Sequence, residues 1–425
     1  MRTLPAATLA LLVGMALACN TDEPTGPEAR VPAMEARPTA PAAVVITRIT
    51  AVDQVGDVGT WTSLVSGSDG RQHIVYQDVG FEDLRYATCA TSCGEASNWT
   101  KVRIDVIGEV GHESALALGA NGRLHVTHYD RANGDLKYTS CAPTADCTTI
   151  AGWKTIRLDT AEDVGRGSAI ALGPGGLRHV SYFRRRVSTS GNNVFALRYA
   201  VCSTGCGQAG GWSKLTIEEV SSASTSSTAA VATSIAIGPD GRRHISYINA
   251  ATGDLKYATC LSGCTSPGNW QKLTIDLLGL VGYYNSLAVG QDGVLHVSYY
   301  DGSHADLKYA RCAADCTTSA NWRKVTVASS NSVGHHSSLA IEPNGRVHIS
   351  SLSHQGAIGA LHYATCNADC TLPQSWSSAL LDGASSHLGA YSSITARNGV
   401  VRISYYDAIN RDLKYLSRTP LVNPF

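Results

Sequence analysis

One motif recurs seven times along the chain and constrains its fold more than any other feature. A full copy reads Ser-x-x-Ala-x-Gly-x-x-Gly-Arg-x-His-Val-Ser-Tyr-Tyr-Asp, then Asp-Leu-Lys-Tyr-Ala-x-Cys-x-x-x-Cys, then Trp-x-Lys-x-x-Ile. Six copies carry the central histidine, at His73, His125, His179, His244, His296 and His348, and Arg402 replaces it in the seventh. We interpret this histidine as structural, because evenly repeated residues do not gather into one site.

Each copy holds four short runs of strand-forming residues separated by turn residues. In the fifth copy they are residues 286–290, 295–300, 306–311 and 322–327, and we call them strands a, b, c and d. No helical period of useful length accompanies them. Seven units of four antiparallel strands predict an all-β fold, a seven-bladed β-propeller over residues 44–425.

The two ends of the chain hold complementary parts of one copy. The seventh copy stops after its strand c, at residues 413–416, without a cysteine pair or a tryptophan. A match for the missing strand d lies near the N-terminus, since residues 47–59 align with residues 99–111. We therefore expect the N-terminal strand to complete the last blade and to close the ring.

The unit resembles WD40 repeats at several positions. Val-Gly-His before strand a, Asn-Gly or Asp-Gly in the a–b turn, and the Asp after strand b recur in WD40 blades. The copies here are longer, lack Trp-Asp at the end of strand c and carry additional cysteine pairs. They also lack the Ser-x-Asp-x-Gly-x-Thr-Trp box of sialidase-type propellers. The resemblance therefore implies a shared architecture and no shared activity.

Twelve of the 13 cysteines form six close pairs, each between strands c and d. The pairs are Cys89 with Cys93, Cys141 with Cys147, Cys202 with Cys206, Cys260 with Cys264, Cys312 with Cys316, and Cys366 with Cys370. We predict six disulfides in an oxidising compartment. Zinc is the alternative, but a structural zinc site needs four ligands and each pair supplies two.

The N-terminal segment predicts export. An apolar run over residues 4–18 follows Arg2 and ends before Cys19, the one cysteine outside the pairs. We interpret residues 1–19 as a signal peptide with a lipobox-like, lipidated Cys19, and cleavage to a freely secreted protein is the alternative. Residues 20–43 have the composition of a disordered tether. The prediction is a lipoprotein of the cell envelope, at the outer membrane or cell surface, held to the membrane by its N-terminal lipid.

The d–a and b–c connections of a propeller share one face, where ligands usually bind. The d–a connections carry aromatic, imidazole or cationic groups in most copies: Trp61, His112, Arg166, Tyr283, Tyr284, His335, His336 and His387. Such groups stack on sugar rings and form hydrogen bonds. For His112 and His335 the alternative is a histidine that anchors strand b of its own blade.

The b–c hairpins repeat an Asp-x4-Asp pattern, which begins at Asp78, Asp130, Asp301 and Asp407. Paired carboxylates suit Ca²⁺ when backbone carbonyls assist them, and they also cap tight turns. We place Asp130, Asp301 and Asp407 among the ligand-binding residues of this face. We expect no metal or other cofactor, with calcium as the alternative.

The third copy breaks the pattern. Its b–c hairpin is longer and carries Arg184, Arg185 and Arg186, and its d–a loop, residues 220–233, is rich in Ser and Thr. Insertions on one face of a repeat protein often form its binding surface. Three arginines suit a carboxylate, sulfate or phosphate. A solvated flexible loop is the alternative.

Charge and motifs narrow the function. Lys and Arg total 34, as do Asp and Glu, so the formal net charge of zero excludes a nucleic-acid binder that relies on bulk charge. No copy carries a unique acid/base set. We predict a monomeric, surface-anchored binding propeller that recognises a glycan or an envelope protein through the d–a and b–c face. The alternatives are a glycoside hydrolase or polysaccharide lyase at the mouth of the central channel, and a scaffold in an envelope complex.

Overall fold

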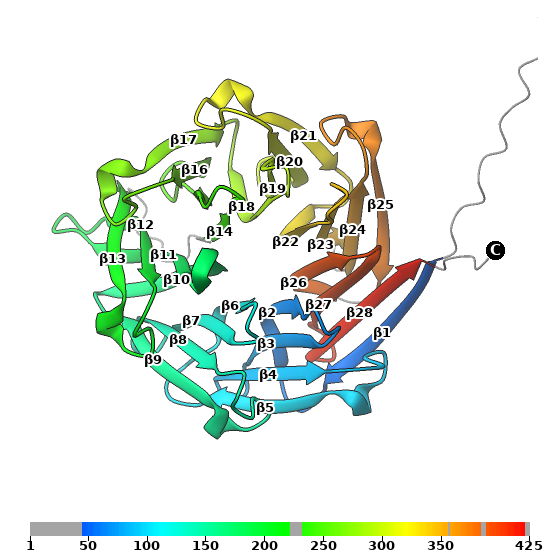
Figure 1. The fold of residues 1–425 in the computed structure, drawn as a ribbon. Helices are drawn as coiled ribbons and strands as arrows, with labels where there is room; N and C mark the ends of the chain where they lie inside the picture. Colours follow the sequence, from blue (N-terminus) through cyan, green and yellow to red (C-terminus); the bar gives the residue numbers. More distant parts are fainter. Residues whose placement is uncertain (1–44, 222–231, 356–357, 384–387, 421–425) are drawn as a thin grey trace, which may run out of the picture. The chain divides into compact units, whose positions relative to one another are not determined.

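The computed structural model describes residues 45–221, 232–355, 358–383 and 388–420. They form seven four-stranded antiparallel sheets, arranged as blades in a ring (Figure 1). This confirms the predicted all-β propeller. Cys19, the predicted tether and His387 lie outside the described residues, and in the described part no helix is long and apolar enough to cross a membrane.

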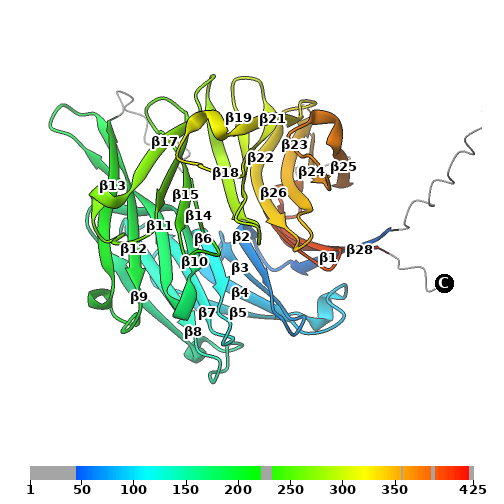
Figure 2. The same cartoon turned by 45° about the horizontal axis from the view of Figure 1, so that its top comes forward.

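Each sheet runs a–b–c–d, and the inner strands surround the centre of the ring (Figures 1 and 2). The first four blades consist of β2 (Val58–Ser66), β3 (Gln72–Asp78), β4 (Asp83–Cys89) and β5 (Thr100–Asp105); β6 (His112–Leu118), β7 (Leu124–Asp130), β8 (Asp135–Cys141) and β9 (Trp153–Asp159); β10 (Asp163–Leu172), β11 (Arg178–Val187), β12 (Asn193–Cys202) and β13 (Ser213–Ser221); and β14 (Thr233–Ile237), β15 (Arg243–Ile248), β16 (Leu255–Cys260) and β17 (Gln271–Asp276). The last three consist of β18 (Val281–Val289), β19 (Leu295–Asp301), β20 (Asp306–Cys312) and β21 (Arg323–Ala328); β22 (Val333–Ile341), β23 (Val347–Gln355), β24 (Ile358–Cys366) and β25 (Trp376–Asp382); and β26 (Leu388–Arg397), β27 (Val400–Asp407), β28 (Asp412–Pro420) and β1 (Val45–Asp53).

Short 3-10 helices occupy the turns. Six precede strand d in blades 1 to 6 and one lies in the a–b turn of the third blade: Ala96–Asn98, Ile150–Gly152, Pro174–Gly176, Ala209–Gly211, Pro267–Asn269, Ser319–Asn321 and Pro373–Ser375.

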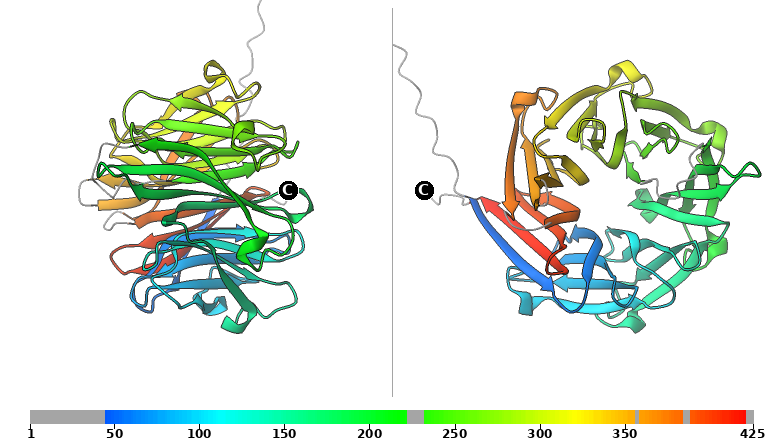
Figure 3. Two further views of the ribbon diagram at one scale, coloured as in Figure 1. Left: turned by 90° about the vertical axis from the view of Figure 1, so that its left-hand side faces the viewer. Right: turned by 180° about the vertical axis from the view of Figure 1, so that it is seen from behind.

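The N-terminal strand closes the ring as predicted. β1 pairs with β28 in antiparallel register, with Val45 opposite Pro420 and Ala51 opposite Lys414. Figure 3 shows blue β1 beside red β28, at the outer edge of the seventh blade. The first and last strands of the described chain therefore belong to one sheet.

The six predicted disulfides are all present, and they fit an exported protein. They join Cys89 to Cys93, Cys141 to Cys147, Cys202 to Cys206, Cys260 to Cys264, Cys312 to Cys316, and Cys366 to Cys370. We predicted that both cysteines of each pair lie between strands c and d. This was wrong for the first cysteine of each pair, which is the last residue of strand c. In the fifth copy we expected strand c to end at residue 311, but β20 extends to Cys312. Each disulfide therefore ties the end of strand c to the turn that follows it.

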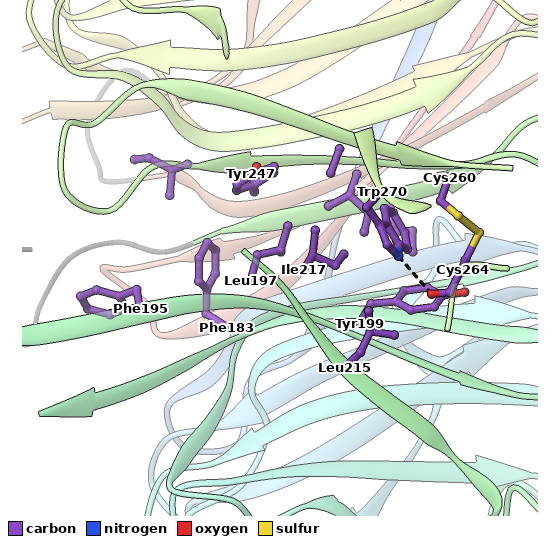
Figure 4. Close-up of a cluster of buried hydrophobic side chains, with 14 residues drawn as sticks. Phe183, Phe195, Leu197, Tyr199, Leu215, Ile217, Tyr247, Cys260, Cys264 and Trp270 are labelled. Carbon is purple, nitrogen blue, oxygen red and sulfur yellow. Dashed lines mark hydrogen bonds between the residues drawn. A yellow bond between two sulfur atoms is a disulfide. The ribbon is translucent and has the colours of Figure 1, made fainter. Parts of the chain in front are cut away.

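The second cysteine of each pair also holds the tryptophan at the start of strand d. Between the third and fourth blades, Trp270 Nε1 donates to the Cys264 carbonyl at 3.0 Å, and the Trp270 ring lies edge-on to Tyr199 with the centroids 4.9 Å apart (Figure 4). The same bond, 2.9–3.1 Å long, is made in the other five stapled blades to the carbonyls of Cys93, Cys147, Cys206, Cys316 and Cys370. The cysteine pair and the tryptophan therefore form one structural unit of the repeat.

The strand-b histidine bonds the tyrosine of strand c in its own blade. His296 Nδ1 and Tyr309 Oη, for example, are 2.5 Å apart. The same pair recurs in five other blades, and all six histidines are buried. This contact explains why the histidine repeats.

A second repeated contact joins a blade to the preceding one at five of the interfaces that the structure describes. The buried Asp276 carboxylate, at the end of β17, accepts hydrogen bonds from Tyr299 Oη at 2.8 Å and from Lys308 Nζ at 2.7 Å. Equivalent Asp or Glu residues bond a Tyr and a Lys or Arg at four other interfaces, including the closure between β1 and the first blade. The Tyr-Tyr-Asp and Asp-Leu-Lys segments of the motif are therefore interblade contacts.

Candidate functional site

The inner strand of a blade bulges where it passes the centre of the ring. In β2, Thr60 lies opposite Gln77 and Ser63 opposite Val75, so two residues of β2 face one residue of β3. Trp61 lies in this bulge with φ 51°, a conformation that costs a non-glycine residue about 1–3 kcal/mol. Equivalent residues with positive φ are Glu113, Gly167, Tyr284, His336 and Tyr391. The bulge recurs in six of the described inner strands and places one residue of each at the channel.

We call this position the ring position, and its residue differs among blades while its neighbours stay similar. It holds Trp61, Glu113, Gly167, Ala232, Tyr284, His336 and Tyr391 in blades 1 to 7. The next residue is Ser, Thr or Asn in every blade. Gly282, two residues before Tyr284, is needed because a Cβ there would lie 2.8 Å from Leu255 Cα of the preceding blade. The repeat thus preserves the backbone at this site and varies the side chain.

Hydrogen bonds fix the backbone at the ring position. Ser337 Oγ donates to the Tyr284 carbonyl at 2.7 Å, and Ser392 Oγ donates to the His336 carbonyl at 3.0 Å. Ser114 makes the same bond, 2.6 Å long, to the Trp61 carbonyl. Six of the ring residues are tied in this way to the following blade, and the site is preorganised.

The ring residues surround a cavity of about 470 Å³, within the size range of small-molecule sites. The cavity is lined by residues of the inner strands and of the segments that lead into them, and all seven blades contribute. Four half-buried rings from blades 5, 6, 7 and 1 form a continuous wall that we call the aromatic arc: Tyr284, His336, Tyr391 and Trp61.

Neighbouring rings of the aromatic arc are in contact and inclined to one another. The centroids of Trp61 and Tyr391 are 4.4 Å apart, those of Tyr391 and His336 are 4.3 Å apart, and those of His336 and Tyr284 are 4.4 Å apart. The angles between their planes are 50°, 53° and 44°. Burial lowers the pKa of His336 to about 3, helped by His335 and His354, so its ring is neutral at physiological pH.

The opposite side of the cavity is small and polar. Gly167 and Ala232 occupy the ring position in blades 3 and 4 and leave an open sector. Glu113, from blade 2, lies between this open sector and Trp61 and accepts a hydrogen bond from the Gly167 N–H. Burial raises the pKa of Glu113 to about 7, although the Gly167 N–H and Arg166 oppose the shift.

Asp163 binds two arginines beside the open sector, so one negative charge is shared by two guanidinium groups. Arg166 Nε donates to both Asp163 oxygens at 3.1 Å, and Arg185 Nη1 donates to Oδ2 at 3.1 Å. Tyr129 Oη donates to Asp163 Oδ1 at 2.7 Å. These arginines therefore have a carboxylate partner before any ligand arrives.

The structure brings four of the candidate residues of the d–a connections to one cavity, namely Trp61, Arg166, Tyr284 and His336. They lie in the inner strands and not in d–a loops, so the loop assignment was wrong. In the fifth copy we expected strand a to begin at residue 286, but β18 begins at Val281. Two shifts of register carry the strand through residues that we had expected to connect the blades.

Their neighbours in sequence point elsewhere. The rings of His335 and Tyr300 are 4.0 Å apart, and His112 Nε2 lies 3.4 Å from Glu109 Oε1. Tyr283 packs against the buried cluster of Figure 4. Of the predicted cationic and imidazole groups, Arg166 does line the cavity.

The predicted aspartates cap their own hairpins. Asp301 Oδ1 accepts hydrogen bonds from the backbone N–H groups of Ser303 at 3.0 Å and His304 at 3.2 Å. Asp130 and Asp407 make equivalent bonds, and all three aspartates are buried away from the cavity. They match the turn-capping alternative.

The three arginines of the third blade lie in β11, which extends the sheet. Arg184 pairs with Glu219 and with Glu162, Arg186 lies 3.5 Å from Glu219, and Arg185 pairs with Asp163. A regular strand replaces the expected loop because β11 and β12 pair as far as Val187 and Asn193.

The disulfide cysteines take no part in this site. None of the cysteines in the described ranges lines the channel cavity. Those in the c–d turns, Cys93, Cys147, Cys206, Cys264, Cys316 and Cys370, each bond one sulfur partner and accept one tryptophan N–H. The pairs therefore match the disulfide prediction and not the zinc alternative, and their role is structural.

Our site prediction left out Glu113 and Tyr391. Both follow a glycine by two residues and precede Ser, as Tyr284 follows Gly282. Alignment of the copies on this glycine identifies them. In the seventh copy we had relied on His387 instead.

No family model matches this chain, and no curated protein matches it significantly in sequence. Among solved structures, a PL25 ulvan lyase is 12% identical with a TM-score of 0.52, over 87% of this chain and 95% of that one. The structure of the PL25 ulvan lyase bound to -[GlcA(1-4)Rha3S]- is 10% identical with a TM-score of 0.52, and it covers the same shares of the two chains. The phage phi92 endosialidase is 10% identical with a TM-score of 0.52, over 89% of this chain and 70% of that one. These likenesses establish the propeller fold alone.

Proposed function

We propose that this protein binds a carbohydrate chain in the channel cavity, between the aromatic arc and the open sector. The observation that carries the proposal is the ring position itself. Four successive blades place an aromatic or imidazole ring at the one site that varies within a constant frame. Inclined rings with adjacent hydroxyls offer stacking surfaces and hydrogen-bond partners to a sugar.

Display on the cell envelope belongs to the same proposal. A lipid on Cys19 and a tether over residues 20–43 would hold the propeller at a membrane and leave its cavity free for a glycan. The disulfides support an exported location. A monomer suffices, because one chain supplies all seven sectors of the cavity.

Glu113 favours a carbohydrate-active enzyme as the second candidate. A carboxyl group with a pKa of about 7 is half protonated at neutral pH and can act as a general acid. Hydrolysis by the usual route needs a second, free carboxylate. Asp163 is engaged by Arg166, Arg185 and Tyr129, so we rank binding first.

The test is a glycan array with the purified protein, followed by product analysis of every glycan bound. Trp61→Ala should weaken binding at least tenfold, because the ring is a central stacking surface. Phe81→Ala is the matched control, since Phe81 lies on the same face, is 61% exposed and is outside the cavity. Loss of binding in the control alone would refute the location, and new reducing or unsaturated ends would favour an enzyme.

A further inference from the structure

The charges around the cavity restrict the ligand further, and this inference rests on the proposed function. Among the described residues that line the cavity, Glu113 and Arg166 are the side chains with a formal charge, since His336 is neutral. The remaining lining residues are aromatic, hydroxyl, amide or small. Which sugars bind therefore depends on whether Glu113 and Arg166 already have partners of opposite charge in the free protein.

Arg166 is already compensated. Its Nε donates to both oxygens of Asp163 at 3.1 Å, and its guanidinium carbon lies 5.1 Å from the centre of the Tyr129 ring. Arg185 binds the same carboxylate from the other side. A uronate or sulfate would share Arg166 with Asp163, so it would gain less from this guanidinium than from one without a carboxylate partner.

Glu113 has no such partner. No salt bridge to its carboxylate is formed within the described ranges, although the positive charge of Arg166 acts on it and opposes the rise of its pKa. Its Oε2 accepts the Gly167 N–H, and Glu113 lines the cavity. The neighbouring ring residue on its other side is Trp61, the end of the aromatic arc.

A carboxylate beside an array of aromatic faces is complementary to a cation. Ring faces attract an ammonium group within about 6 Å, most strongly when the ring is Trp or Tyr, at about 0.5–2 kcal/mol. An ammonium paired with a carboxylate gains charge-assisted hydrogen bonds in addition. The hydroxyls of a neutral sugar can donate hydrogen bonds to Glu113 but bring no compensating charge, and an anionic sugar would be repelled by its ionised form.

We propose that the cavity takes an amino sugar with a free ammonium group, which pairs with Glu113 and lies against the aromatic arc. The chain positions each part of this receptor on a different blade: Glu113 on blade 2, Trp61 on blade 1 and Tyr391 on blade 7. The open sector at Gly167 and Ala232 leaves space for the neighbouring sugar units.

The proposal predicts a coupling between ligand and protons. In the free protein, burial raises the pKa of Glu113 to about 7. A bound ammonium favours the ionised carboxylate and lowers that pKa. Affinity for a permanently charged ligand should therefore rise between about pH 5.5 and about pH 8, with proton release on binding near pH 6.

Titration calorimetry with three matched probes tests this. The probes are a glucosamine oligomer, its fully N-acetylated form and its N-trimethylated form, at equal length. We expect the free-amine and trimethylated oligomers to bind at least tenfold more tightly than the acetylated one at about pH 7.5. Only the trimethylated probe isolates Glu113, because its own charge does not change with pH.

Glu113→Gln should reduce binding of both cationic probes at least tenfold and abolish the pH dependence for the trimethylated one. It keeps an acceptor for the Gly167 N–H, and its melting temperature monitors folding. Glu109→Gln is the control, since Glu109 lies close in sequence but pairs with Arg131 outside the cavity. Unchanged affinity in Glu113→Gln would overturn the proposal.

The same panel separates the two levels of inference. Equal or tighter binding of the acetylated oligomer, or Trp61-dependent binding of a neutral or anionic glycan in preference to the amines, refutes the amino-sugar assignment and leaves glycan binding intact. Absence of binding to every glycan on the array refutes the proposed function as well.

Discussion

Glu113 shows at the scale of one residue how the ring position departs from the rest of the repeat. Its backbone has φ 52°, and its carboxyl group is held where burial disfavours charge. Both features cost free energy, and other copies hold less costly residues at the same place, such as Gly167 and Ala232. Residues kept in unfavourable environments are concentrated at functional sites.

Glu113→Gln is expected to stabilise the folded protein at pH 8 and to have little effect at pH 4. Burial raises the pKa of Glu113 from 4.5 to about 7, so the stability that its neutral form confers is complete below pH 4.5 and is lost as pH rises through 7. The amide stays neutral and avoids this loss, a gain of about 3 kcal/mol at pH 8. Denaturant unfolding at the two pH values measures it, and equal effects at both would contradict the assignment.

The sequence predicted Trp61, Tyr284 and His336 as candidate site residues because aromatic and imidazole groups differ from the repeated residues around them, and the structure places all three at one cavity. It could not decide between His335 and His336, or between Tyr283 and Tyr284. In a regular strand successive residues face opposite sides, and a bulge exchanges those sides by one residue. The bulge follows from contacts between blades, such as Gly282 against Leu255, which no single copy encodes.

At the scale of elements, the acidic residue at the end of strand d joins neighbouring sheets. Asp276 is buried, and it bonds Tyr299 and Lys308 of the following blade. Burial by itself would raise the pKa of Asp276, but the hydrogen bonds from Lys308 and Tyr299 hold it below its usual value. The strand pattern was predictable from each copy, whereas this contact depends on the position of its neighbour.

Asp276→Ala should destabilise the protein by about 3 kcal/mol, because it leaves the Lys308 ammonium partly buried without its main partner. The contribution of Asp276 is present above the pKa of an unfolded Asp and is lost as pH falls through its lowered folded value. The difference between wild type and variant should therefore shrink in acid. Urea unfolding at about pH 7 and about pH 3 tests this, with the exposed Glu95→Ala as control; a constant difference would argue against it.

At the scale of the whole molecule, one seam holds the ring closed. Across it, the Trp99 and Tyr415 rings are 5.1 Å apart, and the Leu64 N–H donates to Ser393 Oγ at 3.0 Å. β1 completes the seventh sheet and covers the edge of β28. Sequence alone predicted this closure, because the missing strand d of the last copy had an aligned match at the other end.

Removal of residues 1–43 should leave the melting temperature within about 2 °C of wild type, since that segment precedes β1. Removal of residues 1–53 should unfold the protein or cause it to associate, because β28 then becomes an unpaired edge. Thermal unfolding and size-exclusion chromatography distinguish the two truncations. A monomeric, fully folded protein without β1 would show that the strand is dispensable.

The pairing of β1 with β28 also sets an order of assembly. β1 is synthesised first, yet its hydrogen-bonding partner is synthesised last, so it stays unpaired while the other blades form. Contacts this distant along the chain slow folding, and they complete it only when the final strand arrives. A nascent chain interrupted before residue 412 would expose one unpaired strand at its beginning and an open sheet at its end. Proteases and chaperones bind exposed strand edges of this kind, and the pairing of β1 with β28 removes both edges in one step.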